Sequence, residues 1–496
     1  MSGSEHSRAT VPTGIGGFDQ LAYGGLPALR STLLEGTTGS GKTVFAIQFL
    51  AEGVRQHAEP GVFVTFEESP VDLRSNMTAL GYKVAAMEEA GAWIFVDASP
   101  VTAGDVVVGD FDFGGLVARI QHAVDKIGAK RVVLDSIGAL FSRFSDPGKV
   151  RFELFGMSAA LKEMQVTSLF TMERSAHGSR SGFGVEEFVA DNVVVLRNIP
   201  EEEKRRRTVE ILKLRGAQHR TGEWLFAIVP GRGIMVVPST FAALRDKAST
   251  ARVSSGCPEL DGMVGGGFYR DSVTVVSGPT GVGKTLMCAQ FLAAGVDAGE
   301  RCLLFSFEES REELLRNART SGVDLNAMED SGKLKMFCEY PEVASLEEHF
   351  VTTRTAIDEF QPRRLAIDNL SALERVATPR GLRDFILGMA SFVKNEEICG
   401  LFTSATETLL GSASITEAHI STLADTIVML RFVEIASEVR RAVAVLKARG
   451  SAHDRTIREF TIDEQGMHIG SPFHGVTGLL TGGAVAATTE KDGGRR

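Results

Sequence analysis

The chain contains Gly36-Thr37-Thr38-Gly39-Ser40-Gly41-Lys42-Thr43, which matches G-x-x-x-x-G-K-[ST], the pattern of a loop that holds the phosphates of a nucleotide. Its glycines allow a tight turn in which successive backbone N–H groups point at one anion. We expect Lys42 to reach the β- and γ-phosphates and the Thr43 hydroxyl to bind Mg²⁺. Residues 31–35 precede the loop as an expected strand and residues 44–50 open an expected helix, so the anion would meet a helix N-terminus.

A second copy of this loop occurs later, as Gly278-Pro279-Thr280-Gly281-Val282-Gly283-Lys284-Thr285. Other segments recur in the same order in both halves of the chain. The matched pairs are Phe66-Glu67-Glu68-Ser69 with Phe307-Glu308-Glu309-Ser310, Val133-Leu134-Asp135-Ser136 with Ala366-Ile367-Asp368-Asn369, Lys213-Leu214-Arg215-Gly216 with Lys447-Ala448-Arg449-Gly450, and His219 with His453. The chain is therefore an internal duplication in which each half carries a complete set of parts.

Within each half, short β-branched runs alternate with helical patterns, which predicts an α/β fold with a mostly parallel sheet flanked by helices. After Asp191 the pattern changes to consecutive strands, with the charged residues 200–207 as an expected solvated hairpin tip. We expect an N-terminal tail at 1–13, a first domain at 14–237, a linker at 238–251, a second domain at 252–470 and a flexible tail at 471–496.

Composition and charge argue against a nucleic-acid-binding, membrane or disulfide-bonded protein. The 496 residues carry a net charge of −10, which provides no basic field for nucleic acid or an anionic membrane. The five cysteines all lie in the second half without C-x-x-C spacing, as expected of reduced, packed thiols. No apolar run is long enough to span a bilayer and no targeting pattern is evident. We therefore expect a soluble cytoplasmic protein that binds neither nucleic acid nor membrane.

A phosphate loop alone lacks a metal-holding carboxylate and a general base, and acidic residues at strand ends can supply both. Asp135 and Asp368 end apolar strands, where a carboxylate can hold Mg²⁺. The pairs Glu67-Glu68 and Glu308-Glu309 end the strand after the loop's helix, so a carboxylate of each pair should project over the γ-phosphate and act as general base. An exposed acidic strand end is the alternative, and recurrence in both halves favours the catalytic interpretation.

Two further features leave alternatives open. Lys213 with Arg215, and Lys447 with Arg449, are either surface cations or cations delivered to a phosphate, including that of a neighbouring subunit. The second half also offers the adjacent hydroxyls of Ser421 and Thr422 where the first half has Glu187 and Phe188. A helix cap or a turn is the ordinary role for such a pair.

These residues, together with Gly184 to Val189, Arg252 to Gly256 and His419 to Thr422, resemble the KaiC family of circadian clock proteins from about Gly14 to about Ile469. The resemblance implies two tandem RecA-like P-loop ATPase domains, a homohexamer with ATP and Mg²⁺ between subunits, slow ATP hydrolysis in the first ring, and autokinase, autophosphatase and ATPase activity in the second. Ser421 and Thr422 would accept phosphate from ATP held by the neighbouring subunit, and Thr416 occupies the position of a transient acceptor.

The resemblance also assigns the site residues. The catalytic set is Glu67, Glu68, Glu308 and Glu309, with Glu308 as general base, and the metal set is Thr43, Asp135, Thr285, Glu308 and Asp368. The nucleotide contacts are residues 38–43 and 280–285 with Leu286, and across the interface Lys213, Leu214, Arg215 and His219 in the first ring and Arg441, Lys447, Arg449, Ser451 and His453 in the second.

The chain also departs from the family pattern. Ser321 and Ala452 stand where cyanobacterial relatives carry Trp, and Asn369 stands for a Ser, so adenine packing in the second ring should be looser. Residues 468–475 do not resemble the segment through which KaiA acts, and we expect no KaiA-type control. A KaiB-like partner would bind the first ring through the loop at 101–112.

Two other functions compete with an ATP-dependent autokinase. One is a RecA-type ATPase that acts on DNA. Strong stimulation of ATP hydrolysis by single-stranded DNA would favour it. Such binding usually uses a basic groove interleaved with aromatic residues, and the sequence shows no such pattern. The other is a nucleotide-switched assembly scaffold, which would form hexamers with ATP in the absence of hydrolysis and phosphotransfer.

Overall fold

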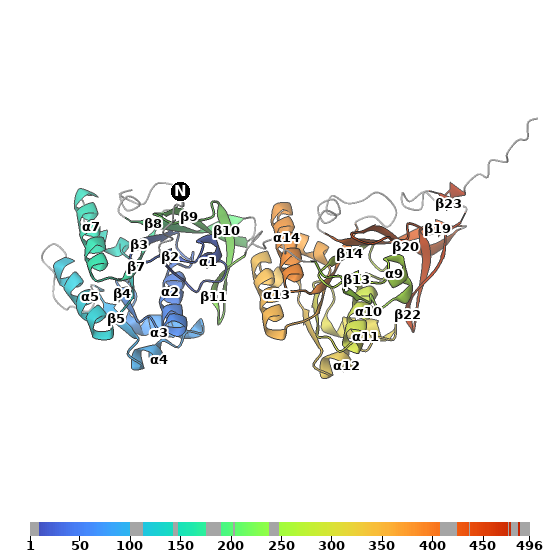
Figure 1. The fold of residues 1–496 in the computed structure, drawn as a ribbon, viewed down its shortest axis with the longest axis horizontal. Coiled ribbons are helices and arrows are strands. Elements are labelled where there is room, and N and C mark those ends of the chain that lie inside the picture. Colours follow the sequence, from blue (N-terminus) through green and yellow to red (C-terminus); the bar gives the residue numbers. More distant parts are fainter. Residues whose placement is uncertain are drawn as a thin grey trace, which may run out of the picture. The chain divides into compact units, whose positions relative to one another are not determined.

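A computed structural model describes residues 9–99, 113–141, 147–174, 190–201, 204–237, 248–406, 424–435, 437–474, 476–477 and 485–486. The chain divides into two compact units, Met1–Pro238 and Ser239–Arg496. Each unit is built on a nine-stranded sheet with helices on its faces (Figure 1). The predicted fold class, two tandem α/β nucleotide-binding domains of mostly parallel sheet, is confirmed.

The sheet of the first unit has the strand order β11-β10-β9-β8-β3-β7-β6-β4-β5. Its strands are β3 (Ser31–Gly36), β4 (Gly61–Thr65), β5 (Trp93–Asp97), β6 (Arg131–Asp135), β7 (Thr167–Glu173), β8 (Asn192–Glu201), β9 (Lys204–Leu214), β10 (Glu223–Val229) and β11 (Gly233–Val236). The helices are α1 (Phe18–Leu21), α2 (Lys42–His57), α3 (Pro70–Ala79), α4 (Val84–Glu89), α5 (Phe113–Ile127), α6 (Gly138–Phe141) and α7 (Pro147–Glu163), and β1 (Thr10–Val11) pairs with β2 (Leu26–Pro27).

The second unit has the same order, which in the same direction reads β22-β21-β20-β19-β14-β18-β17-β15-β16. Its strands are β14 (Val273–Gly278), β15 (Cys302–Ser306), β16 (Leu334–Cys338), β17 (Arg364–Asp368), β18 (Cys399–Ala405), β19 (Thr426–Ile435), β20 (Glu438–Ala448), β21 (Arg458–Asp463) and β22 (Gly466–Pro472). The helices are α9 (Pro258–Met263), α10 (Lys284–Asp297), α11 (Arg311–Arg319), α12 (Leu325–Asp330), α13 (Leu346–Phe360) and α14 (Pro379–Asn395), with 3₁₀ turns η1 (Pro341–Val343) and η2 (Leu370–Val376). Short strands β12 (Arg252–Val253) and β13 (Phe268–Tyr269) pair, as do β23 (Val476–Thr477) and β24 (Val485–Ala486).

Parallel pairing joins β8, β3, β7, β6, β4 and β5, whereas β9, β10 and β11 continue the sheet antiparallel. Because the carboxyl ends of parallel strands lie at one edge, the residues that follow β3, β4, β6 and β7 gather there. The second unit has the same arrangement around β14. This edge, which we call the loop edge, is where the phosphate loops lie.

Local sequence explains where several helices begin. The Ser69 and Ser310 side chains accept hydrogen bonds from the backbone N–H groups of Asp72 and Glu313, and Glu313 completes a capping box. Helix α5 presents an apolar face at helical spacing, with Leu116, Ile120 and Val124 buried against the sheet. Helices α5 and α7 cover the sheet face opposite α2.

The hairpin end predicted at residues 200–207 is present, but its strands run further than expected. The ladder between β8 and β9 continues through Pro200–Arg205 to Glu201–Lys204. Antiparallel pairing needs only backbone groups, so charged side chains at a solvated edge do not end it. Two strands extend beyond the predicted domain boundaries. Strand β22 ends at Pro472, past the boundary at residue 470, and β1 lies within residues 1–13, the predicted N-terminal tail.

Some expectations fall outside the described residues: the loop at 101–112, the segment 184–189, Thr416, and the hydroxyl pair Ser421 and Thr422. Within the described part of the chain, no helix combines the length and the apolarity needed to cross a bilayer.

Candidate functional site

Each phosphate loop joins a buried central strand to a helix that begins at the invariant lysine position of the motif. Lys42 Nζ donates to the carbonyl oxygens of Gly36 at 2.9 Å and Thr37 at 3.2 Å. Lys284 Nζ repeats this with Gly278 at 2.8 Å and Pro279 at 2.9 Å. Burial lowers the pKa of both lysines, and nearby carboxylates oppose that shift. Both ammonium groups therefore lie at the carbonyl oxygens of the first two residues of their phosphate loop.

Glycine is required at two positions of each loop. A Cβ at Gly36 would lie 2.4 Å from Ser40 Oγ, and a Cβ at Gly278 would lie 2.6 Å from the carbonyl oxygen of Leu430. Gly41 precedes α2 in the left-handed region, with φ of 98°. The close approach of backbone to backbone leaves the loop's N–H groups directed at one point, as a phosphate site requires.

The strand-end aspartates lie beside the loop threonines. Asp135 accepts hydrogen bonds from the hydroxyls of Thr171 and Thr43, and burial, opposed by these bonds, raises its pKa. In the second unit Asp368 accepts from the Thr403 hydroxyl. A hydroxyl and a carboxylate at one point suit Mg²⁺, which usually takes one or two carboxylates together with phosphate oxygens. In the described ranges no group of three or more His, Cys, Asp or Glu side chains is placed to hold a metal alone.

The two glutamates of each pair have different surroundings. Partial burial, and then the carboxylates of Asp135 and Glu173, raise the pKa of Glu67, whose charge also interacts with Lys42. Glu68 instead accepts a hydrogen bond from Asn76 Nδ2 at 3.2 Å. Thus the first glutamate faces the lysine and the metal-side aspartate, and the second faces helix α3.

The second unit repeats this division. Glu308 interacts electrostatically with Lys284, whereas Glu309 accepts a hydrogen bond from Asn317 Nδ2 at 3.0 Å. Burial raises the pKa of Glu309, and this hydrogen bond opposes the shift. Of the four predicted catalytic carboxylates, Glu67 and Glu308 are the ones turned to the phosphate-binding lysines.

Sequence reasoning missed a third carboxylate in the first unit. Glu173 ends β7 beside Gly36 of β3 and accepts a hydrogen bond from the Thr38 hydroxyl within the loop. In the second unit Ala405 occupies this strand end, opposite Gly278. An acidic residue directly after the apolar run 167–172 was the available signal, and the lack of a counterpart in the second repeat concealed it.

The predicted cations of each unit lie at the opposite edge of the sheet from its own loop. Lys213 pairs with Val193 at the start of β8, and Lys213 Nζ donates to the carbonyl oxygen of Ala190 at 2.8 Å. Arg215 is half exposed and lies 3.7 Å from Asp191. Because β8 runs parallel to β3, this start lies away from Gly36, which is level with Leu196. We call this side of the sheet the cation edge.

The second unit has the same cation edge. Lys447 Nζ donates to the carbonyl oxygen of Ala424 at 2.7 Å, and Arg449 lies 3.9 Å from Asp425. These contacts are level with Thr274 of β14, and the four steps from Thr274 to Gly278 span about 13 Å at roughly 3.3 Å per residue.

The remaining predicted interface residues are spread along the sheet. His219 and His453 are half-buried in the segments that follow Arg215 and Arg449, and Leu214 is buried at the end of β9. Ser451 is held by Arg252, which stacks on the Tyr269 ring at 4.0 Å. Arg441 pairs with Phe432 near the loop-edge end of β20, six positions from Lys447. The structure therefore places Lys447 and Arg449 together and separates Arg441 from them.

Comparison with known proteins agrees with this geometry. A family model described as the KaiC ATPase matches residues 11–240 and 253–473, one match for each unit. The chain is 56% identical over 475 residues to the circadian clock protein KaiC3 of Synechocystis sp., covering 95% of this chain and 94% of that protein. It is 47% identical to the circadian clock oscillator protein KaiC of Thermostichus vulcanus, covering 97% and 93%, and 47% identical to that of Prochlorococcus marinus, covering 99% and 98%. The chain belongs to the KaiC family of clock-type ATPases.

Proposed function

We propose that the first unit hydrolyses ATP and that the second transfers the γ-phosphate of ATP to Ser421 and Thr422 of a neighbouring copy, with Mg²⁺ in both sites and the copies arranged as a homohexameric ring. In the transfer, the bond between the γ-phosphorus and the bridging oxygen of ATP breaks and ADP is released. The phosphoryl group forms an ester with a side-chain hydroxyl, and the hydroxyl proton passes to a glutamate. In the first unit the acceptor is water and the product is inorganic phosphate.

The observation that carries this proposal is the opposite placement of the two parts of each nucleotide site. The phosphate loop lies at the loop edge, while Lys213 and Lys447 lie at the cation edge of the same sheets. One copy cannot bring both parts to one nucleotide, but head-to-tail contact between copies can, and a head-to-tail interface that closes produces a ring. The cations then stabilise charge on phosphate held by the next copy.

The metal and base are supplied by the copy that holds the loop. Thr43 with Asp135, and Thr285 with Asp368, would hold Mg²⁺, which neutralises phosphate charge when bound. The raised pKa of Glu67 suits a group that must take a proton. We assign the general-base role to Glu67 in the first unit and to Glu308 in the second, and a positioning role to Glu68 and Glu309.

The acceptor assignment rests on what precedes β19. Ala424 and Asp425, directly after the 421–423 segment in sequence, are held by Lys447 and Lys394 at the cation edge of the second unit. Ala424 is thus the described residue nearest in sequence to the predicted acceptors, and it lies on the side proposed to meet the next copy's loop. A KaiB-like partner stays a prediction from the resemblance.

Phosphosite mapping tests the assignment. The protein is incubated with γ-labelled ATP and Mg²⁺, and we expect label on Ser421 and Thr422 with loss of label in the Ser421→Ala/Thr422→Ala variant. Lys284→Met should abolish labelling and leave hydrolysis by the first unit, whereas Lys42→Met should remove most hydrolysis. Label that persists in the double alanine variant at unchanged level would refute the acceptors.

A further inference from the structure

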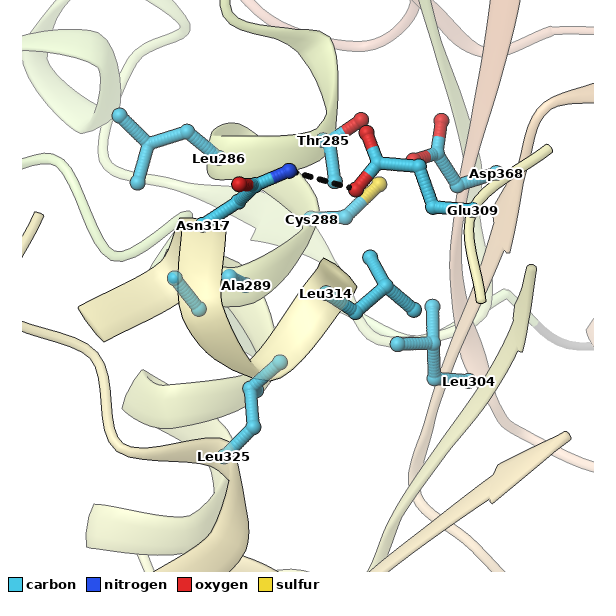
Figure 2. Close-up of a pocket in the computed structure, with 11 residues that line it drawn as sticks. Thr285, Leu286, Cys288, Ala289, Leu304, Glu309, Leu314, Asn317, Leu325 and Asp368 are labelled. Carbon is cyan, nitrogen blue, oxygen red and sulfur yellow. Dashed lines mark hydrogen bonds between the residues drawn. The ribbon is translucent and has the colours of Figure 1, made fainter. Parts of the chain in front are cut away.

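A pocket lies beneath the candidate site of the second unit, between α10 and the helices α11 and α12 (Figure 2). It has an empty volume of about 440 Å³, which includes open solvent at its mouth. Thr285, Glu309 and Asp368 line one end, and Figure 2 shows them above the side chains of Leu304, Leu314 and Leu325. The pocket therefore joins an apolar floor to the carboxylates of the nucleotide site.

The first unit carries larger side chains at three of the corresponding positions and smaller ones at three others, Val44, Ala46 and Val84. Ala289, on the second turn of α10, corresponds to Ile47 of α2, the central Leu304 of β15 to Phe63 of β4, and Ala318 of α11 to Met77 of α3. All three larger side chains are at most 1% exposed. Phe63 also stacks on Trp93, with ring centroids 6.2 Å apart. At these three positions the first repeat therefore places more side-chain atoms than the second.

The chemistry of the lining selects a type of ligand. Leucine and alanine side chains and the Cys288 thiol surround the floor, and the side chain of Asn317 is already engaged by Glu309 at 3.0 Å. The lining includes the carboxylates of Glu309 and Asp368 and no lysine, arginine or histidine, and the Asp368 carboxylate also interacts with the Lys284 ammonium group behind the lining. An occupant with a short apolar body and a single positive charge would bury its hydrocarbon part and pair its charge at the mouth.

We propose that this pocket, which we call the α10–α11 pocket, is a binding site for a short primary alkylammonium ion, and that the first unit has no equivalent site. The alkyl chain packs among Ala289, Leu304 and Ala318, and the ammonium group donates to Glu309 and Asp368. Because these carboxylates border the candidate metal position, occupancy inhibits nucleotide chemistry in the second unit only. Binding itself does not depend on the proposed phosphotransfer.

Ligand-observed NMR on the full chain without nucleotide tests binding. The probe is n-butylammonium, titrated with saturation-transfer detection, and n-butanol and ammonium chloride at matched ionic strength are the uncharged and chain-free controls. We expect a signal from n-butylammonium that exceeds the signal from n-butanol at the same concentration. Equal binding of the two, or no saturable binding of n-butylammonium, overturns the proposal.

Variants that copy the first repeat locate the site. Ala289→Ile and, independently, Ala318→Met should weaken n-butylammonium binding about tenfold or more, because side-chain atoms then occupy the apolar volume. Ile47→Val, a smaller change at the corresponding position of the first unit, is the control and should leave binding unchanged. Circular dichroism verifies that each variant is folded. Unchanged affinity in both filled variants overturns the assignment, and because the readout is binding, this result is separate from any failure of phosphotransfer.

Discussion

The adjacent glutamates show how one residue step separates two roles. Neighbouring side chains at the end of a strand point to opposite sides, so only one member of Glu67-Glu68 can face the phosphate loop. Glu67 interacts with Lys42 and Asp135, while Glu68 is bound by Asn76. Their recurrence as Glu308-Glu309, with the same division, makes the distinction testable in either unit.

We predict unequal effects for the two glutamine substitutions of the first unit. In a Lys284→Met background, which isolates the first site, Glu67→Gln should lower kcat for ATP hydrolysis about 10²–10⁴-fold, the usual contribution of a general base. Glu68→Gln should lower it much less, because that side chain contacts α3. Steady-state phosphate release measures both, and equal losses would show that the assignment within the pair is wrong.

A pH profile tests the influence of Glu173 on Glu67. A general base works in its deprotonated form, so hydrolysis is lost as the pH falls through the pKa of Glu67, which lies above its ordinary value. Glu173→Gln removes one of the negative charges that raise this pKa, and the acidic limb of kcat/KM should move to lower pH.

The control for that profile is Glu89→Gln, at the exposed end of α4. This substitution makes the same chemical change away from the phosphate loop and should leave the acidic limb in place. An acidic limb that moves upward in Glu173→Gln, or that moves equally in both variants, would contradict the electrostatic account.

Among single residues, the sequence predicted those that belong to a local motif. The loop and the strand-end aspartates were found because chemistry and neighbouring strand signals coincide. The direction of each glutamate was not predictable, since it depends on how β4 and β15 end against α3 and α11. Glu173 was missed because its partner Thr38 is distant in sequence and Ala405 breaks the repeat.

The phosphate loop as an element depends on close contact between β14 and its neighbours. A Cβ at Gly278 would meet the Leu430 carbonyl oxygen at 2.6 Å and Val282 Cγ1 at 3.0 Å, so Gly278→Ala should displace the loop and strongly weaken ATP binding by the second unit. Gly262→Ala, in α9 with open space around the added methyl group, is the control and should be neutral or stabilising by about 0.5–1 kcal/mol. Fluorescent-nucleotide titration in a Lys42→Met background distinguishes them, and equal affinity would contradict the packing argument.

A buried arginine connects the elements of the first unit. Arg131 is fully buried at the start of β6, donates to Glu59 Oε2 at 2.7 Å and to the carbonyl oxygens of Pro12 and Phe49, and lies over the Phe49 ring. It thereby fixes the segment before α1 and the middle of α2 to the sheet. Arg364 repeats this in the second unit with Glu300, Ser254 and Phe291.

Arg131→Met should lower the free energy of unfolding of the first unit by about 3–5 kcal/mol, because it leaves Glu59 and two carbonyl oxygens without their donor. Arg363→Met, which removes a surface ion pair to Glu397 at 3.8 Å, should change stability by about 1 kcal/mol or less. Denaturant titration resolved by unit is the measurement. Similar small changes in both variants would show that Arg131 does not anchor the first unit.

Element existence was largely predictable, whereas element ends were not. Sequence pattern predicted the strand at 31–35, which is β3, and a helix opening at 44–50, which lies within α2. The hairpin at residues 200–207 was predicted but not the length of its strands, because sequence composition cannot show that β8 and β9 remain paired to Glu201 and Lys204. The cation edge was beyond sequence reasoning, since it requires knowing that β8 lies beside β3 and runs parallel to it.

For the whole molecule, duplication explains the common parts and substitution explains the differences. Both units keep the same strand order, loop, aspartate and cation edge. The first unit adds Glu173 and carries larger side chains at three positions that line the α10–α11 pocket of the second, while the second carries the hydroxyl pair Ser421 and Thr422 in its sequence. Under the proposed function, two sites of one design are directed to water and to a protein hydroxyl.

The central claim, that each nucleotide site is completed by a second copy, is tested most directly by mixing two inactive variants. Lys284→Met cannot use ATP in its second unit but keeps its acceptors, and Ser421→Ala/Thr422→Ala keeps its loop but lacks acceptors. The two are combined before nucleotide is added, and γ-labelled ATP with Mg²⁺ follows. We predict label on Ser421 and Thr422 of the Lys284→Met chain in the mixture and none in either variant alone. A mixture that assembles into joint rings and stays unlabelled would contradict the account.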